Sequence, residues 1–395
     1  MAEKIRKAFM GADAVAYAMK QINPDVVAAY PITPQTEIMH EFAKYVADGD
    51  VQTDLVTVES EHSAMSATVG ASAAGARAMT ATAANGLALM WEIVYIAAST
   101  KLPIVMNVVN RALSGPINIH CDHSDSMGCR DSGWIQFYSE SAEEAYENTI
   151  LAVKLAEHPD IRLPVMVCQD GFITSHAVED IEVLDDESVN NFIGEFQATY
   201  PLLDVDNPVT YGPLDFFDYY FEHKRQQIEC MDHVIETYKK IADEFGQLIG
   251  KKLDTIEEYY MGDAEIAICV MSSSAGTTRI VVDEFRKKGI KAGMLKIRMF
   301  RPFPAEDITK WLGKVKAVAV LDRSASFGAV GGPIFNEVRA AFYEWKEKPL
   351  LKNHIFGLGG RELDLNLITS VYNDLQEVVK NQNVGQLVNY LGVRD

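Results

Sequence analysis

The chain has 395 residues and carries 36 Lys and Arg against 56 Asp and Glu, which gives a formal net charge of −20. This acidity excludes nucleic acid and anionic membrane surfaces as partners, because both attract basic faces. The five cysteines are scattered, without a CxxC pair or an iron–sulfur ligand run, and the first residues lack the apolar run of a signal peptide. No window is apolar enough to span a bilayer, so we expect a reduced, cytoplasmic protein of two or three domains.

Strand-like and helix-like segments alternate through the first half of the chain. In order, the patterns predict a helix over 9–22, a strand over 26–30, a helix over 37–46, a strand ending near 58, a helix of small residues from 63, a strand over 77–82, a turn at 85–86, a helix over 87–98, a strand over 104–109, a polar loop over 111–133, a helix over 142–157 and a strand over 165–168. Such alternation is typical of an α/β fold, a parallel sheet with helices on both faces.

The rhythm breaks over 181–258, which is first acidic, then aromatic, then helical. We interpret this segment as a connector that wraps a neighbour. Alternation then resumes, with strands predicted over 265–271, 291–297 and 317–321 and helices over 277–288, 305–312 and 334–345. The sequence therefore predicts two domains, 1–255 with the connector at its end and a smaller α/β domain over 256–395.

Polar side chains follow several of the predicted strands. Thr33 stands between two prolines in Tyr30-Pro31-Ile32-Thr33-Pro34, Glu61 opens the small-residue helix, and Asn110-Arg111 follows the strand over 104–109. Ligands of open α/β sheets bind beyond the carboxyl ends of the strands, so these groups are expected to converge there. Each also has an ordinary interpretation: a strand-to-helix turn for Thr33, a helix N-terminal charge for Glu61 and a surface ion pair for Arg111.

Two further motifs have weaker functional readings. Asp122-His123-Ser124-Asp125 lacks the spacing of a zinc site, and we expect a hydrogen-bonded loop anchor. The glycine-rich run from Phe327 to Pro333 does not match the GxGxxG fingerprint of dinucleotide-binding domains. A GDG followed by an asparagine, the usual magnesium–diphosphate signature of thiamine enzymes, is also missing.

Together, the YPITP element, Glu59-Ser60-Glu61, Asn110-Arg111-Ala112-Leu113 and Asp122–Asp125 resemble the alpha subunit of 2-oxoacid:ferredoxin oxidoreductases. Within that family, this chain most closely resembles the alpha subunit of the multi-subunit pyruvate:ferredoxin oxidoreductases (pyruvate synthases). The resemblance covers nearly the whole chain. The resemblance implies a pyrimidine-binding domain for thiamine pyrophosphate plus a transketolase-C-terminal-like domain.

The family divides its cofactors among subunits. The resemblance implies that a beta subunit binds the diphosphate through Mg²⁺ and carries a 4Fe–4S cluster, that a ferredoxin-like subunit carries further 4Fe–4S clusters, and that a gamma subunit completes the complex. Ferredoxin, CoA and a 2-oxoacid would be the other partners, and no metal is expected in this chain. A dimer of such heteromers is also implied.

The resemblance assigns roles residue by residue. Glu61, with Gly70 nine places on, corresponds to the carboxylate that bonds the pyrimidine N1′ and favours the imino tautomer. Thr33 corresponds to a threonine that contacts substrate and Arg111 to the arginine that holds its carboxylate, so both count as catalytic with Glu61. Tyr30 and Pro31 would lie against the cofactor.

Substrate choice is expected from the loop after Arg111. Ile117 and Ile119 occupy the places where the family puts aliphatic side chains around the substrate's methyl group. An apolar pocket favours pyruvate, and tolerates 2-oxobutyrate, because one methylene is worth only about 1–3 kcal/mol. His120, Cys121 and the pair Asn85-Gly86 depart from the familiar pattern.

The predicted function is CoA-dependent oxidative decarboxylation of pyruvate to acetyl-CoA and CO₂, with electrons passed to ferredoxin. One alternative keeps the chemistry with another acid: 2-oxoisovalerate, 2-oxoglutarate, 2-oxobutyrate or oxalate. Another alternative is a non-catalytic scaffold subunit whose site has lapsed.

Overall fold

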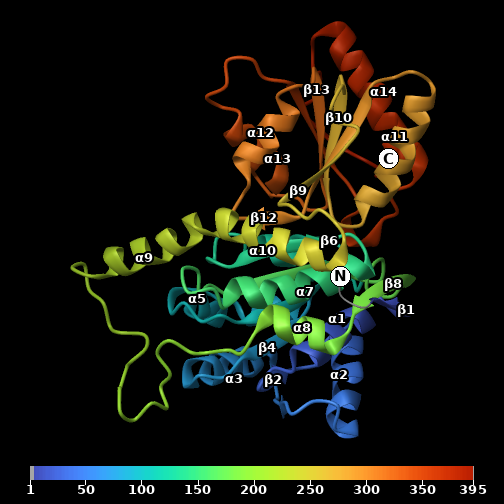
Figure 1. Cartoon of the computed structure of the whole chain (residues 1–395). Helices are drawn as coiled ribbons and strands as arrows, with labels where there is room; N and C mark the ends of the chain where they lie inside the picture. The colour runs from blue at the N-terminus through green and yellow to red at the C-terminus, as the bar shows by residue number, and fades with distance from the viewer. Residues whose placement is uncertain (1–3, 395) are drawn as a thin grey trace.

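The computed structural model describes residues 4–394, and its chain folds into two stacked lobes with a long arm at one side (Figure 1). The lower lobe in that view is built on a seven-stranded sheet of order β12-β6-β7-β5-β4-β2-β3. Its strands are β2 (Val26–Ala29), β3 (Asp54–Thr57), β4 (Ala78–Thr82), β5 (Val105–Asn110), β6 (Ile135–Ser139), β7 (Val165–Asp170) and β12 (Met299–Arg301). All pairs are parallel except β12 with β6.

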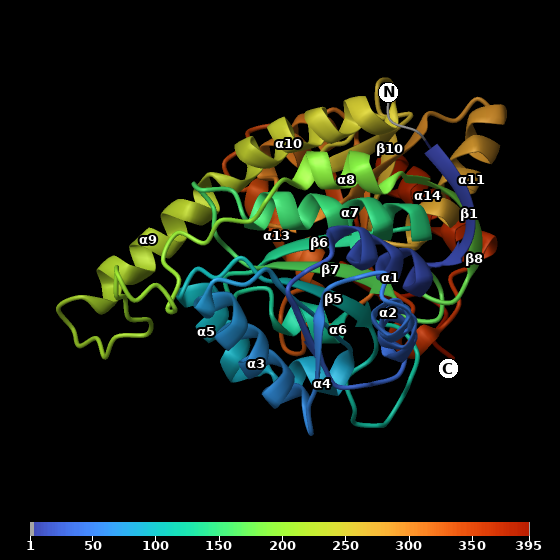
Figure 2. The same cartoon turned by 60° about the horizontal axis from the view of Figure 1, so that its bottom comes forward.

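Helices cover both faces of this sheet, as predicted. One face packs against α1 (Gly11–Ile22), α2 (Thr36–Asp48) and α7 (Ala142–Ala156), with α8 (Asp186–Ile193) and α10 (Val234–Ile249) outside them. On the other side lie α3 (Glu61–Ala74), α4 (Ala84–Leu89), α5 (Trp91–Ser99) and α6 (Ser124–Gly128), and Figure 2 shows the two groups of helices with the strands between them. The core residues are almost all fully buried, so this lobe has a complete hydrophobic core on each face.

The upper lobe has a six-stranded sheet of order β15-β14-β13-β10-β11-β9. Its strands are β9 (Ile256–Tyr259), β10 (Ile266–Met271), β11 (Ala292–Ile297), β13 (Ala317–Asp322), β14 (Leu350–Ile355) and β15 (Val388–Tyr390). One face packs on α11 (Ser274–Lys287) and α14 (Leu365–Asn381), the other on α12 (Ala305–Leu312) and α13 (Pro333–Ala341), and a short helix η1 (Leu358–Gly360) follows β14. The two-domain division at residue 255 stays a prediction, and one strand crosses it, because β12 joins the lower sheet.

Several predicted elements differ from the structure. The helix predicted over 9–22 is preceded by a strand, β1 (Lys4–Met10), which pairs with β8 (Val178–Leu184) at the start of the connector. The turn predicted at Asn85-Gly86 is wrong, because both residues lie inside α4. The helix predicted over 87–98 is split at Met90 into α4 and α5.

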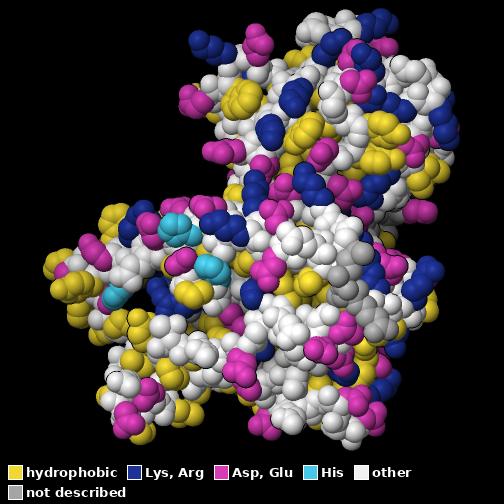
Figure 3. All heavy atoms as spheres, viewed as in Figure 1, with side chains coloured by type: hydrophobic (Ala, Val, Ile, Leu, Met, Phe, Trp, Pro, Cys, Tyr) yellow, Lys and Arg dark blue, Asp and Glu magenta, His cyan; other side chains and the backbone are white. Residues whose placement is uncertain are grey.

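The arm is formed by the connector. After α8 the chain runs without helix or strand to α9 (Tyr220–Asp232), none of whose residues is buried. Its exposed apolar side chains include Leu203, Val205, Leu214, Phe217 and Phe221, and hydrophobic atoms gather over the arm in Figure 3. An exposed apolar surface of this kind is typical of an interaction site, and the contact of the connector with a neighbour stays a prediction.

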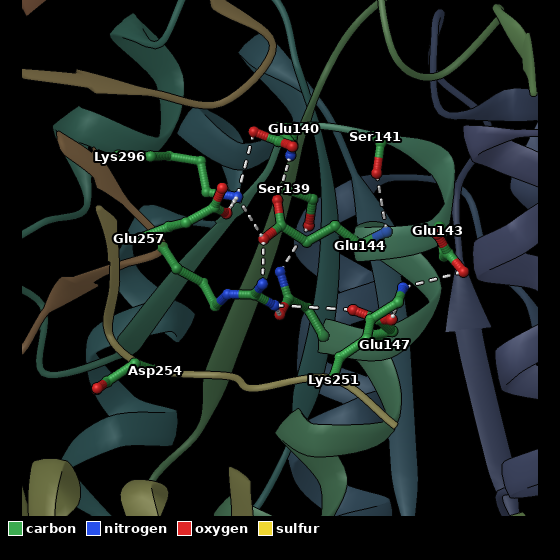
Figure 4. Close-up of polar contacts among 12 residues, drawn as sticks. Ser139, Glu140, Ser141, Glu143, Glu144, Glu147, Lys251, Asp254, Glu257 and Lys296 are labelled. Atoms are coloured by element: carbon green, nitrogen blue, oxygen red, sulfur yellow. Dashed lines mark hydrogen bonds and ion pairs between the residues drawn. The ribbon is translucent and has the colours of Figure 1, made fainter. Parts of the chain in front are cut away.

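A buried ion-pair network joins the two lobes (Figure 4). Lys296 of β11 is 1% exposed and lies 3.0 Å from Glu144 of α7, 2.8 Å from Glu257 and 3.2 Å from Glu140. Arg298 also contacts Glu144, at 2.7 Å. Burial alone would raise the pKa of Glu144, but the charges of Arg298 and Lys296 lower it to about 2.

Candidate active site at the carboxyl edge of the lower sheet

Glu61 lies where the sequence places it, at the first position of α3 directly after Ser60. The Ser60 hydroxyl accepts a hydrogen bond from the Ser63 amide, which caps the helix. Glu61 is 8% exposed, and within residues 4–394 no group donates a hydrogen bond to its carboxylate. Its oxygen atoms reach the surface and are therefore available to accept a hydrogen bond from a ligand.

Gly86 allows the close approach of Glu61 to the backbone of α4. A Cβ on Gly86 would lie 2.8 Å from Oε1 of Glu61 and 2.6 Å from Oγ1 of Thr82, at the end of β4. The Thr82 hydroxyl is buried and has no partner among the described residues. The glycine therefore lets the Glu61 side chain and the Thr82 hydroxyl pack directly against the backbone of α4, while both polar atoms keep unused hydrogen-bonding capacity within residues 4–394.

Arg111 and the Thr33 loop are brought together. Nη1 of Arg111 donates to the Thr33 carbonyl at 2.9 Å, and Nε donates to the Asn118 carbonyl at 2.9 Å. Arg111 is 8% exposed, and its Nη2 makes no hydrogen bond to residues 4–394. Hydrogen bonds from Nε and Nη1 thus fix the plane of the guanidinium, and Nη2 is left to donate to an anion.

The remaining predicted residues are more exposed. Tyr30 is 37% exposed, and Pro31 and the Thr33 side chain are also exposed. Ile117 and Ile119 are 79% and 43% exposed on the loop after Arg111, so this chain alone does not enclose them. We found no hydrogen bond between Glu61 and either Thr33 or Arg111 within residues 4–394.

Asp125 links the two halves of the site. Its Oδ2 accepts from the backbone amides of Ala84 and Arg111, both at 3.0 Å, and its Oδ1 accepts from the Asn110 amide at 2.8 Å and from the Ser126 backbone at 2.7 Å. Burial raises the pKa of Asp125 to about 6, and these four donors oppose the rise. The hydrogen-bonded loop anchor expected at 122–125 is confirmed, and it fixes α4 against the strand end that carries Arg111.

A second buried cluster adjoins the anchor. Ligand atoms of Cys121, His123 and Asp170 lie within 4.8 Å of one another. Burial opposes ionisation of Asp170, but Arg323 at 3.2 Å and His123 hold its pKa well below the usual range. Burial also raises the pKa of the Cys121 thiol. Because Arg323 already supplies the cation, we interpret the cluster as an anchor between the lobes and assign it no metal.

Sequence reasoning missed the contributions of Gly86, Thr82 and the upper lobe. The turn expected at Asn85-Gly86 does not predict that Gly86 packs against Glu61. A glycine shortly after a strand is the sequence signal that could indicate such a close approach. Arg323 and the glycines of η1 come from the domain for which the sequence predicted no site residue. Their approach depends on contacts between residues far apart in the chain.

Sequence comparisons agree with this architecture. The family described as "Pyruvate flavodoxin/ferredoxin oxidoreductase, thiamine diP-bdg" matches residues 17–243, and "Pyruvate:ferredoxin oxidoreductase core domain II" matches residues 264–368. The chain is 57% identical to pyruvate synthase subunit PorA of Thermotoga maritima, covering 99% of this chain and 98% of that protein. It is 39% identical to ketoisovalerate oxidoreductase subunit VorA of Pyrococcus abyssi, covering 98% of this chain and 97% of that protein.

Solved structures share the fold. A 2-oxoglutarate:ferredoxin oxidoreductase from Magnetococcus marinus matches with a TM-score of 0.73 and 21% identity, over 94% of this chain and 65% of that chain. A split-gene transketolase matches with a TM-score of 0.55 and 12% identity, over 94% of this chain and 99% of that chain. The expected fold, a thiamine-enzyme pyrimidine-binding domain followed by a transketolase-C-terminal-like domain, is confirmed. The chain belongs to the pyruvate:ferredoxin oxidoreductase family of thiamine diphosphate-binding 2-oxoacid oxidoreductases.

Proposed function

We propose that this chain is the alpha subunit of a pyruvate synthase, which with its partners oxidises pyruvate and CoA to acetyl-CoA and CO₂ and reduces ferredoxin. The observation that carries the proposal is the Glu61 carboxylate at the start of α3, which packs against the backbone of Gly86 and has no donor within residues 4–394. The 57% identity to a pyruvate synthase subunit supports the choice of pyruvate over 2-oxoisovalerate.

Glu61 would hold the pyrimidine N1′ of thiamine pyrophosphate, with Tyr30 and Pro31 beside the ring. When bound, the cofactor supplies the nucleophilic carbon and accepts the electrons released on decarboxylation. The role of Glu61 would be to place negative charge at N1′, which favours a proton on that ring nitrogen and the loss of one from the exocyclic amine, that is, the imino form. A carboxylate that is free of protein donors is available for this contact.

Arg111 would bind the carboxylate of the 2-oxoacid through Nη2, while the Thr33 hydroxyl contacts the keto group. Because Nε and Nη1 are already bonded to protein carbonyls, the guanidinium plane is fixed before substrate arrives. Such pre-orientation lowers the entropic cost of reaching the reactive geometry.

We expect Arg111→Lys to raise the KM for pyruvate by about 10- to 100-fold, because an ammonium cannot replace the fork and a charged hydrogen bond contributes about 1.5–3 kcal/mol. The affinity of the complex for thiamine pyrophosphate should stay at its wild-type value. Steady-state kinetics with cofactor titration measures both. A KM unchanged in the variant would remove Arg111 from substrate binding.

The partners proposed are a diphosphate-binding beta subunit with Mg²⁺ and a 4Fe–4S cluster, a ferredoxin-like cluster subunit, a gamma subunit and ferredoxin. The face of α4 and α5 bears exposed Leu89, Trp91 and Ile96 beside the Glu61 site, and a partner that closes the site would cover it. Ile117 and Ile119 would also be enclosed in that complex. No helix within residues 4–394 is long and apolar enough to cross a membrane.

The test is anaerobic viologen or ferredoxin reduction by the purified complex, with pyruvate, 2-oxoglutarate, 2-oxoisovalerate and oxalate each assayed with and without CoA. We expect pyruvate turnover that requires CoA. Turnover of 2-oxoglutarate or oxalate without pyruvate would overturn the argument from Ile117 and Ile119. A complex that holds thiamine pyrophosphate and intact clusters yet turns over none of these acids would favour the scaffold alternative.

A further inference from the structure

A glycine turn of the upper lobe packs against the loop that follows Arg111. The turn, Gly357–Gly360, comes after β14, and φ is +66° at Gly357, +61° at Gly359 and +81° at Gly360. A Cβ would lie 2.4 Å from Nδ2 of Asn118 if placed on Gly359, and 2.4 Å from Cβ of His120 if placed on Gly360. Both the backbone conformation and the close approach therefore require glycine.

Three hydrogen bonds fasten the turn to the loop. The Gly360 amide donates to the Cys121 carbonyl at 2.7 Å, and the Gly359 amide donates to Oδ2 of Asp122 at 3.2 Å. In the reverse direction, Nδ2 of Asn118 donates to the Gly359 carbonyl at 3.0 Å. The segment from 118 to 122 is thus held by the other lobe along its whole length.

Asn118 connects this attachment to the guanidinium of Arg111. Its backbone carbonyl accepts from Nε of Arg111 at 2.9 Å, and its side-chain Oδ1 accepts from the His120 amide at 2.7 Å. The loop is closed by a bond from the Ala112 amide to the His120 carbonyl at 3.0 Å. A shift of the Asn118 carbonyl would therefore rotate the guanidinium of Arg111, whose Nη1 is bonded to the Thr33 carbonyl.

We propose that the Gly357–Gly360 turn is a positioning element for Arg111, which it orients through Asn118, so that the upper lobe sets the affinity of the site for the 2-oxoacid carboxylate. The proposal rests on the proposed function, in which Arg111 binds that carboxylate. Neither the turn nor Asn118 touches substrate. Both act by fixing the plane of the guanidinium.

The test compares Gly360→Ala and Asn118→Ala with Gly289→Ala in the assembled complex. Gly289 has φ +77°, and a Cβ there meets nothing within 4 Å, so its alanine variant reproduces the backbone strain without the clash. We expect Gly360→Ala and Asn118→Ala to raise the KM for pyruvate by about 10-fold or more. The KM for CoA and the affinity for thiamine pyrophosphate should match those of Gly289→Ala.

A double-mutant cycle with Arg111→Lys separates this proposal from the proposed function. If the turn acts through Arg111, Gly360→Ala and Asn118→Ala add little to the KM of Arg111→Lys, since interacting residues are not additive. Full additivity, or pyruvate KM values within about twofold of Gly289→Ala, would overturn the positioning role while leaving the pyruvate activity standing. If the Gly360→Ala complex does not assemble, Asn118→Ala still tests the positioning role. An unaltered KM in Arg111→Lys itself would overturn both the substrate contact and the route through it.

Discussion

Replacing Glu61 by glutamine should lower the turnover of the assembled complex by about 10²- to 10⁴-fold, the range expected when a positioned acid–base group is lost. Glutamine keeps the shape of the side chain beside Gly86, so packing at the start of α3 is preserved. It removes the negative charge that the proposed role requires. The measurement is viologen reduction with saturating pyruvate and CoA, with subunit assembly checked by size-exclusion chromatography.

Glu59→Gln is the matched control. Glu59 lies two residues earlier, is exposed, and accepts a hydrogen bond from the Ser63 hydroxyl at 2.5 Å. The same change of charge there should leave turnover at its wild-type value. Near-wild-type turnover in Glu61→Gln would instead support the scaffold alternative, because a lapsed site does not need the carboxylate.

Much of the lower lobe could be predicted from local sequence patterns. Apolar spacing predicts the strand at 26–30 and the helix at 142–157, and the structure has them as β2 and α7. The convergence of Thr33 with Arg111 followed from the rule that strand ends share one edge of a parallel sheet. The elements are predicted correctly because each depends on residues close together in the chain, and the convergence is predicted correctly because the sheet is parallel.

The failures have a common physical origin in long-range contact. The edge strand β1 has no buried run of its own and is specified by pairing with β8, which lies more than one hundred and fifty residues away (Lys4 pairs with Leu184). At Asn85-Gly86, a dipeptide typical of turns is overridden because Gly86 must lie against Glu61. Likewise, nothing local to Gly359 or Arg323 indicates that they reach the loop after Arg111.

The junction between the lobes leads to the second large expected effect. Lys296→Met should destabilise the chain by about 1.5–3 kcal/mol, the range for losing hydrogen bonds between charged groups. The loss is not larger because Glu144 keeps Arg298, and Glu140 and Glu257 keep Arg279. Methionine matches the length of lysine, so the loss is chiefly electrostatic: Glu144, Glu140 and Glu257 each lose a cation within 3.2 Å. Urea unfolding followed by tryptophan fluorescence measures the change.

Lys240→Met is the matched control for that experiment. Lys240 pairs with Glu236 at 2.7 Å on the surface of α10, with side chains 72% and 75% exposed, and such helix pairs contribute only about 0.3–0.5 kcal/mol. Comparable losses in the two variants would show that the junction is no stronger than a surface pair.

The pH dependence gives a separate check on the cause. The pKa of Glu144 is lowered to about 2 in the folded chain, so its contribution to stability is present above its unfolded pKa and disappears as pH falls toward about 2. The difference between wild type and Lys296→Met should therefore be full near neutral pH and shrink in acid. A difference that stays constant from pH 7 into that acid range would assign the loss to packing. The two lobes would then be held together at α7 by shape, and the ion pairs would serve only to fix their register.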